Sequence, residues 1–231
     1  MNVILRLCAA AVTALLVAAQ AHAVGLADLS NKDAAAGLKD ALTKGSQAAV
    51  AALGKQDGFL RNERVKIPLP ESLHKVEGMM RSLGLGKYAD ELVVTMNRAA
   101  ESAVVEAKPL LLSAVKNMSV QDAKGILTGG QDAATQYFKR TTSGPLTDRF
   151  LPIVAKATRK VKLADKYNEF AGKGAKFGLI DTKDADLNNY VTRKALDGLF
   201  LMIADEEKKI RQDPVGAASG IISKVFGAIG K

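Results

Sequence analysis

Asn97, Arg98 and Glu101 form the first of two polar clusters whose residue types could do chemistry. They fall within one helical turn and place an amide, a cation and an anion beside a face that is otherwise alanine. Arg98 and Glu101 are close enough on a helix to pair. The cluster predicts either a site that orients a ligand in a helix groove or a hydrogen-bond network that sets helix packing, and we favour the network.

The second cluster joins two expected helices with almost no linker. Backbone amides that are free at the start of a helix bind phosphate or carboxylate groups, which predicts an anion site. In the structural interpretation, Gly130 supplies a left-handed residue that ends the first helix, and Asp132 takes the free amides as a cap or first-turn acid. An acid already in place weakens the case for an anion site. The candidate ligand-binding residues are Gly129, Gly130, Asp132, Thr135 and Tyr137.

Residue types that usually bind metals or act as nucleophiles are scarce. The only cysteine, Cys8, lies in the expected leader, and His74 is the only histidine after it. A transition-metal site or a nucleophile–base pair needs more such side chains than that. We therefore expect no metal and no cofactor, and an enzyme of this composition would be a hydrolase that uses carboxylates.

The N-terminus predicts export. Arg6 precedes an apolar stretch from Leu7 to Ala19, and Ala21-His22-Ala23 has the small-x-small pattern that signal peptidase cleaves. The apolar stretch is shorter than the roughly 20 residues that a membrane-spanning helix needs. We expect residues 1–23 to be a cleaved signal peptide and the mature chain to begin at Val24.

The chain carries a formal net charge of +9. In an exported protein such a charge faces anionic lipids and acidic polymers, so no nucleic-acid partner is expected. A solvated surface that aids solubility explains the charge equally well.

Apolar residues recur at spacings of three and four along most of the chain, and period-two alternation is rare. This pattern predicts an all-α fold, a single multi-helix bundle with short loops over residues 24–213. The prolines of residues 62–70 predict an extended strap, and Ser119 with Asp122 predicts a capping box. Ser143 with Pro145 is expected to open a new helix that Pro152 kinks. The three glycines of residues 172–178 predict a mobile loop.

Residues 214–231 are expected to form an amphipathic C-terminal helix. Its apolar face docks on the bundle and completes the core, or it detaches to contact an anionic membrane or a partner. The candidate contact residues are Ile221, Ile222, Lys224, Val225, Phe226 and Ile229.

Four separated segments resemble, in order, a bacterial family catalogued as domain of unknown function 4197. They are residues 65–70, 96–101, 129–137 and 194–200, and the resemblance runs from about Leu38 to Phe226. It implies a helical protein of the bacterial envelope, located in the periplasm, and it implies no reaction or ligand.

These observations favour a non-enzymatic periplasmic binding or interaction protein. Its partner would be a lipid or other amphiphile in a helical groove, or an anionic membrane surface. The alternatives are a structural envelope protein that docks on another protein, and the carboxylate hydrolase.

Overall fold

The computed structural model describes residues 31–176 and 185–213 of the chain, which form helices and no strand. The expected signal peptide and C-terminal helix lie outside these residues. Within them, no helix is long and apolar enough to cross a membrane. The predicted all-α bundle is confirmed, with eight helices: α1 (Asn31–Gly54), α2 (Glu71–Ser82), α3 (Gly86–Val104), α4 (Ala107–Lys116), α5 (Val120–Thr128), α6 (Ala133–Thr158), α7 (Lys162–Lys176) and α8 (Leu187–Gln212).

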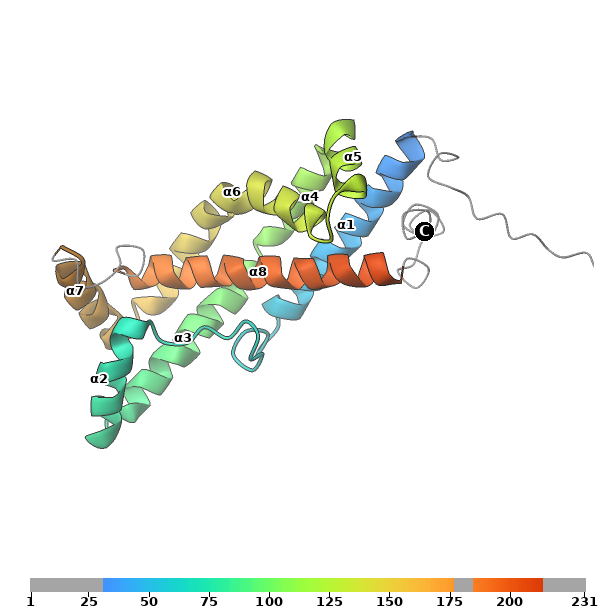
Figure 1. Cartoon of the computed structure of the whole chain (residues 1–231). Coiled ribbons are helices and arrows are strands. Elements are labelled where there is room, and N and C mark those ends of the chain that lie inside the picture. The colour runs from blue at the N-terminus through green and yellow to red at the C-terminus, as the bar shows by residue number, and fades with distance from the viewer. Residues whose placement is uncertain (1–30, 177–184, 214–231) are drawn as a thin grey trace, which may run out of the picture.

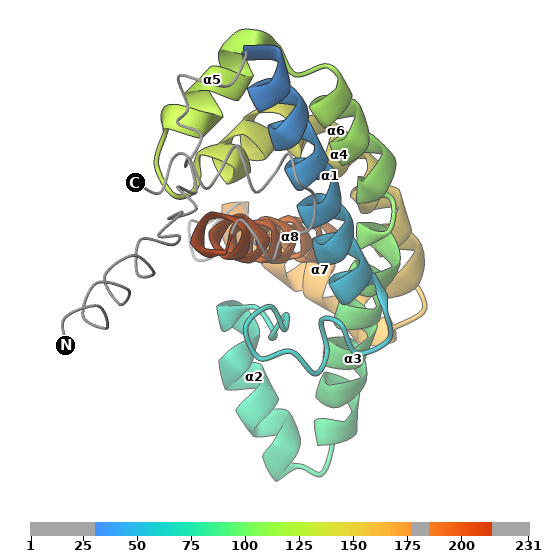
Figure 2. The ribbon, with the colours of Figure 1, turned by 90° about the vertical axis from the view of Figure 1, so that its right-hand side faces the viewer.

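Helix α8 runs through the middle of the bundle and packs against α6, α1 and α3 (Figure 1). Seen along α8, the other long helices lie around it (Figure 2). The side chains that face inward are apolar at helical spacing, so their burial holds the helices together. The largest fully buried ones include Phe59, Phe138, Phe150, Tyr167, Leu38, Leu53, Leu92, Met96, Leu111, Leu146 and Leu187.

Residues 55–70 connect α1 to α2 without a helix, and the strap predicted within this segment is confirmed. Phe59 and Ile67 are fully buried, so the segment contributes to the core. The hydroxyl of Tyr190 on α8 donates to the carbonyl of Pro68 at 3.1 Å. An arginine–carboxylate pair, Arg64 with Asp205, ties the segment to α8 near the surface.

Several helix boundaries follow from local chemistry. Ser119 and Asp122 form the predicted capping box: the Asp122 amide donates to the Ser119 hydroxyl at 3.0 Å, and the Ser119 amide donates back to the Asp122 carboxylate at 3.3 Å. Pro109 lies in the first turn of α4, where its missing N–H costs no hydrogen bond.

Helix α6 corrects the prediction of a new helix at Ser143 and Pro145. It runs unbroken through Pro145 and Pro152. Each proline leaves one carbonyl four residues earlier without its helical partner, on Thr141 and Asp148, and both residues are exposed. Water satisfies such carbonyls, while the buried stripe that continues through Leu146, Phe150 and Val154 holds the helix together.

The predicted loop at residues 172–178 is also corrected in part. Residues 172–176 belong to α7, and residues 177 and 178 lie outside the described ranges. A glycine costs a helix interior only about 1 kcal/mol. Packing of Ala164, Tyr167 and Ala171 on the buried side of α7 outweighs that cost.

Candidate functional site

Asn97 on α3 fastens the strap to the bundle. Its side-chain oxygen accepts the amide of Ile67 at 2.9 Å, and its side-chain nitrogen donates to the carbonyls of Ile67 at 2.9 Å and Val93 at 2.8 Å. The residue is fully buried. The side-chain amide of Asn97 therefore bonds both the N–H and the C=O of Ile67, as a residue on a neighbouring β-strand would.

Glu101 and Arg98 hold the preceding turn of the same segment. One Glu101 oxygen accepts the amides of Phe59 and Leu60, both at 3.1 Å, and the other accepts Arg98 at 2.6 Å. Arg98 also donates to Asp57 at 2.7 Å. These carboxylates raise the pKa of Arg98 above its ordinary value. Asp57 adopts φ 66°, a left-handed conformation that this ion pair helps to maintain.

The first predicted cluster thus binds the chain's own backbone. Asn97, Arg98 and Glu101 all face the segment between α1 and α2, and the arrangement is the hydrogen-bond network that was favoured from the sequence.

The start of α6 holds an anion, and that anion is Glu207 of α8. The carboxylate accepts the amides of Ala134 at 3.0 Å and Thr135 at 2.9 Å, and the Thr135 hydroxyl at 2.8 Å. Arg211 donates to the same carboxylate at 2.8 Å and to the carbonyl of Ile126 at 3.0 Å. A buried carboxylate is stable here because amides, a hydroxyl and a guanidinium all bind it.

Sequence reasoning missed this role of Glu207. The spacing of four residues predicts only a charge pair of Glu207 with Arg211 along the helix, and that pair is present. The available signal was position: Glu207 follows Leu199 and Ile203 at spacings of four on the buried stripe of α8, where a carboxylate needs a partner on another helix.

The second predicted cluster differs from the expectation in two residues. Asp132 precedes α6 without capping it, and its carboxylate accepts Gln136 instead, at 2.9 Å. Among the described glycines, positive φ occurs at Gly84 and not at Gly130. Gly129 is the constrained position, because an added Cβ would lie 2.5 Å from the Gly125 carbonyl oxygen.

Tyr137 supports the neighbouring helix. Its hydroxyl donates to the carbonyl of Ala114 on α4 at 2.8 Å. Burial raises the pKa of the phenol, so the hydroxyl stays protonated and keeps donating. Like Asn97, Glu101 and Thr135, it has a partner inside the protein.

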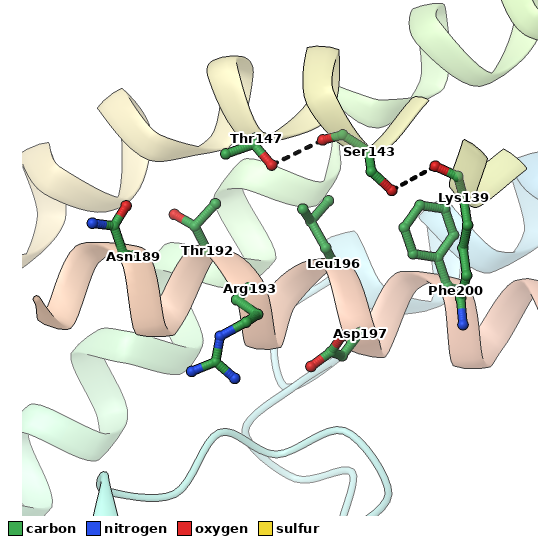
Figure 3. A pocket seen from close by; sticks show the side chains of 9 residues that line it. All are labelled: Lys139, Ser143, Thr147, Asn189, Thr192, Arg193, Leu196, Asp197 and Phe200. Atoms are coloured by element: carbon green, nitrogen blue, oxygen red, sulfur yellow. Dashed lines mark hydrogen bonds between the residues drawn. The ribbon is translucent and has the colours of Figure 1, made fainter. Parts of the chain in front are cut away.

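An open groove of about 410 Å³ lies between α6 and α8 (Figure 3). Three rows of side chains, each spaced by four residues, line it. The floor comes from Thr192, Leu196 and Phe200 of α8, which are nearly buried. The more exposed walls come from Lys139, Ser143 and Thr147 of α6 and from Asn189, Arg193 and Asp197 of α8.

Thr192 is the unusual residue of this groove. It is 2% exposed, and its hydroxyl has no hydrogen-bond partner among the described residues. Its side chain extends from α8 toward α6 (Figure 3). A buried hydroxyl without a partner costs about 1–3 kcal/mol.

The charged residues of the groove are Lys139, Arg193 and Asp197. The Lys139 ammonium lies 5.9 Å from the centre of the Phe200 ring, at the end of the groove away from Thr192. Arg193 stacks over Tyr190 at 5.6 Å. Arg193 and Asp197 line the outer wall of the groove, and their side chains point away from α6 (Figure 3).

A second groove, of about 330 Å³, lies between α1 and α8. Its charged residues include Lys44 with its partner Asp40 and Lys209 with its partner Glu206. Two further cavities beside it measure about 10 Å³ each, too small for more than a water molecule. No group of three or more His, Cys, Asp or Glu that could hold a metal occurs in the described part of the chain.

These features define an all-α bundle with one buried strap and a polar groove between its two longest helices. The sequence profile of the family described as "Protein of unknown function (DUF4197)" matches residues 28–227, and the chain belongs to that family. No curated protein and no solved structure matches the chain.

Proposed function

We propose that this chain is a non-enzymatic binding protein of the periplasm whose ligand lies in the groove between α6 and α8. The observation that carries the proposal concerns Thr192, a residue of the groove lining whose buried hydroxyl has no hydrogen-bond partner in the described structure.

The hydroxyl stands out because the rest of the buried polar side chains are bonded. Eight polar or charged residues are buried in the described part, and each of the other seven has a hydrogen bond. Buried threonines of α6 donate back to the carbonyl four residues earlier, as Thr142 does to Phe138 at 2.7 Å. Thr192 makes no such bond. Its hydroxyl oxygen is buried, so a ligand atom in the groove reaches it once the Thr192 side chain rotates toward the groove.

The shape of the groove indicates the size of the ligand. Thr192 and Phe200 are eight residues apart on one helix, a distance of roughly 12 Å. The space of about 410 Å³ falls within the usual range for small-molecule sites. The ligand is therefore a short, elongated molecule.

The lining indicates the chemistry of the ligand. Asn189 offers hydrogen bonds at one end, and Thr192 adds its hydroxyl there once its side chain rotates toward the groove. The Lys139 ammonium offers a positive charge at the other end. Leu196 and Phe200, which form the apolar part of the floor, together expose little surface. These groups suit a small polar molecule with a carboxylate or phosphate better than a long acyl chain, so we take the small anion as the ligand class.

Two-carboxylate hydrolysis is not favoured at this groove. Such chemistry needs a second acid at about 5–10 Å from the first. The lining contains one carboxylate, Asp197, whose side chain points away from α6.

Native mass spectrometry of the protein purified from its own periplasm tests the proposal. The expected spectrum contains a bound small molecule that dissociates on unfolding. Thr192→Val, which removes the hydroxyl and keeps the shape, should lower the bound fraction through an affinity loss of about tenfold, the usual value of one hydrogen bond.

Thr142→Val is the matched control, because it removes an equally buried hydroxyl outside the groove. It should retain the ligand. Equal occupancy in both variants, or a protein that carries no small molecule and gains no melting temperature from di- and tricarboxylates or phosphate monoesters, would count against the groove as a binding site.

A further inference from the structure

The end of the hairpin formed by α2 and α3 carries a cluster of exposed apolar side chains. Eight large hydrophobic residues are exposed in the described part of the chain, and four of them fall within residues 79–88: Met79 at 66%, Leu83 at 68%, Leu85 at 42% and Tyr88 at 44%. Single exposed hydrophobic residues are normal, but a cluster marks a contact surface.

This cluster lies on a projection rather than in a groove. Helix α2 packs against α3, and the two helices extend together beyond the rest of the bundle (Figures 1 and 2). A convex apolar end has no pocket that could hold a side chain of a partner. It can itself insert into the apolar part of a lipid bilayer.

Hydrogen bonds and an ion pair fix the conformation of the hairpin end. Gly84 adopts φ 73°, and the Leu85 amide donates to the Met80 carbonyl at 2.7 Å, which closes the turn. Arg81 donates to Glu77 on α2 at 2.8 Å and to Asp90 on α3 at 2.6 Å, so one guanidinium ties both helices together. The apolar side chains are therefore presented by a fixed turn.

One cation at this end suits an anionic surface. Residues 79–88 contain Arg81 and Lys87, and because Glu77 and Asp90 neutralise Arg81, Lys87 carries the positive charge. The Lys87 ammonium lies 5.1 Å from the centre of the Tyr88 ring. Tyrosine and lysine side by side suit the boundary between lipid headgroups and acyl chains. The net charge of +9 of the whole chain adds a long-range attraction to the same surface.

We infer that the end of the α2–α3 hairpin inserts into the interface of a bilayer that contains anionic phospholipid. Met79, Leu83 and Leu85 enter the boundary of the acyl chains, and Lys87 stays among the headgroups. A protein partner is disfavoured because four partly exposed side chains offer a few hundred Å², less than the roughly 800 Å² per partner of a stable protein interface.

Tryptophan fluorescence tests the inference directly, since the chain has no tryptophan. Leu83→Trp places the probe at the hairpin end, and Val120→Trp places it at the start of α5, at the opposite end of the molecule (Figure 1). The two original side chains are almost equally exposed, at 68% and 65%, so neither change disturbs the core.

Vesicles of equal parts phosphatidylethanolamine and phosphatidylglycerol should shift the emission of Leu83→Trp to the blue and leave that of Val120→Trp unchanged. Phosphatidylcholine vesicles should require more lipid for the same shift. An unchanged Leu83→Trp emission, or an equal shift in both variants, overturns the inference; a shift with another envelope protein and none with vesicles overturns it in favour of a protein partner.

A second pair of variants removes the dependence on an added tryptophan. Met79→Ser combined with Leu83→Ser should reduce sedimentation with the anionic vesicles at least about tenfold, because two apolar side chains leave the interface. Val120→Ser should not change it. Equal sedimentation of both proteins would contradict insertion of the hairpin end.

Discussion

Glu207 on α8 accepts both the amide and the hydroxyl of Thr135, at 2.9 and 2.8 Å, so the helix start predicted to bind an anion binds the protein's own carboxylate. The contact joins the second polar cluster to the central helix. Because Arg211 reaches from the same site to the Ile126 carbonyl, three helices meet at one buried ion pair. This polar contact therefore joins α5, α6 and α8 and holds their relative positions.

Replacing Glu207 by Gln should destabilise the fold. Gln keeps one acceptor but turns an NH₂ group toward donors, and Arg211 loses its buried counter-charge. The free energy of unfolding should fall by about 2–4 kcal/mol in urea denaturation.

Glu206→Gln is the control for this change. Glu206 pairs with the exposed Lys209 on the surface of the same helix, so the loss should stay below about 1 kcal/mol. Equal losses for the two variants would mean that the contacts of Glu207 are no stronger than a surface pair.

Gly129 and Gly130 should respond differently to alanine. A Cβ at Gly129 would lie 2.5 Å from the Gly125 carbonyl oxygen and 2.8 Å from the Ala133 Cβ, so the backbone must move. A Cβ at Gly130 would meet only one carboxylate oxygen of Asp132, at 3.7 Å, which is an ordinary van der Waals contact. Calorimetry should show Gly129→Ala less stable by about 1–3 kcal/mol and Gly130→Ala within about 0.5 kcal/mol of the parent protein. If Gly130→Ala were the less stable of the two variants, Gly130 would have the left-handed conformation expected from the sequence.

Asn97→Ala should release the strap from α3. The variant leaves the amide and the carbonyl of Ile67 without their partner, at a cost of about 2–3 kcal/mol. Limited trypsin digestion should then cut after the exposed Lys66 faster than in the parent protein. Asn117→Ala removes an exposed amide that makes one long bond to Ser113 at 3.3 Å, and it should change neither quantity. Trypsin resistance unaltered by Asn97→Ala would argue that apolar packing alone holds the strap.

Local patterns predicted most of the helices, because helix starts and ends depend on nearby residues. The capping box at Ser119 and the strap prolines are of this kind. The failure at Pro145 has the opposite cause: the buried stripe of α6 packs against α8 and α3, and that tertiary contact outweighs a local helix breaker.

The candidate sites were harder to predict for the same reason. Asn97 and Glu101 were identified as a polar cluster, but their partners are 30 and 42 residues away in the chain. A helical groove was expected, but its lining residues were not, because Lys139 and Thr192 come together only when α6 packs against α8. A threonine on an apolar stripe looks like a core residue until the structure shows that its hydroxyl lacks a partner in the described part.

Acid should weaken the contact between the strap and α8. The hydrogen bond and charge of Arg64 lower the pKa of Asp205 below its ordinary value of 3.8. A carboxylate with a lowered pKa stabilises the folded state fully above the ordinary pKa, and the contribution is lost as the pH falls through the folded-state pKa. Asp205→Asn should therefore lose less stability than the parent protein between about pH 5 and pH 2.

The control for acid unfolding is Asp148→Asn, a change at an exposed position of α6. It should follow the parent protein through the same pH range. High salt should shrink the difference between the parent and Asp205→Asn, because the pair is partly exposed and salt screens it. If the free energy of unfolding fell equally with pH for the parent protein and Asp205→Asn, this pair would not couple protonation to folding.

Thr192→Val should not destabilise the ligand-free protein. Most buried polar groups lose hydrogen bonds when they are replaced, but the Thr192 hydroxyl has none to lose among the described residues. Valine has the same shape and removes the cost of burying an unpaired hydroxyl, so the free energy of unfolding should stay equal or rise by up to about 1–2 kcal/mol. Thr142→Val is the comparison, since it breaks a 2.7 Å bond to Phe138, and it should lose about 1 kcal/mol. Both values come from urea denaturation of extensively dialysed protein. A Thr192→Val protein less stable than Thr142→Val would mean that the hydroxyl is already satisfied within the fold, and the groove would lose the residue that marks it as a binding site.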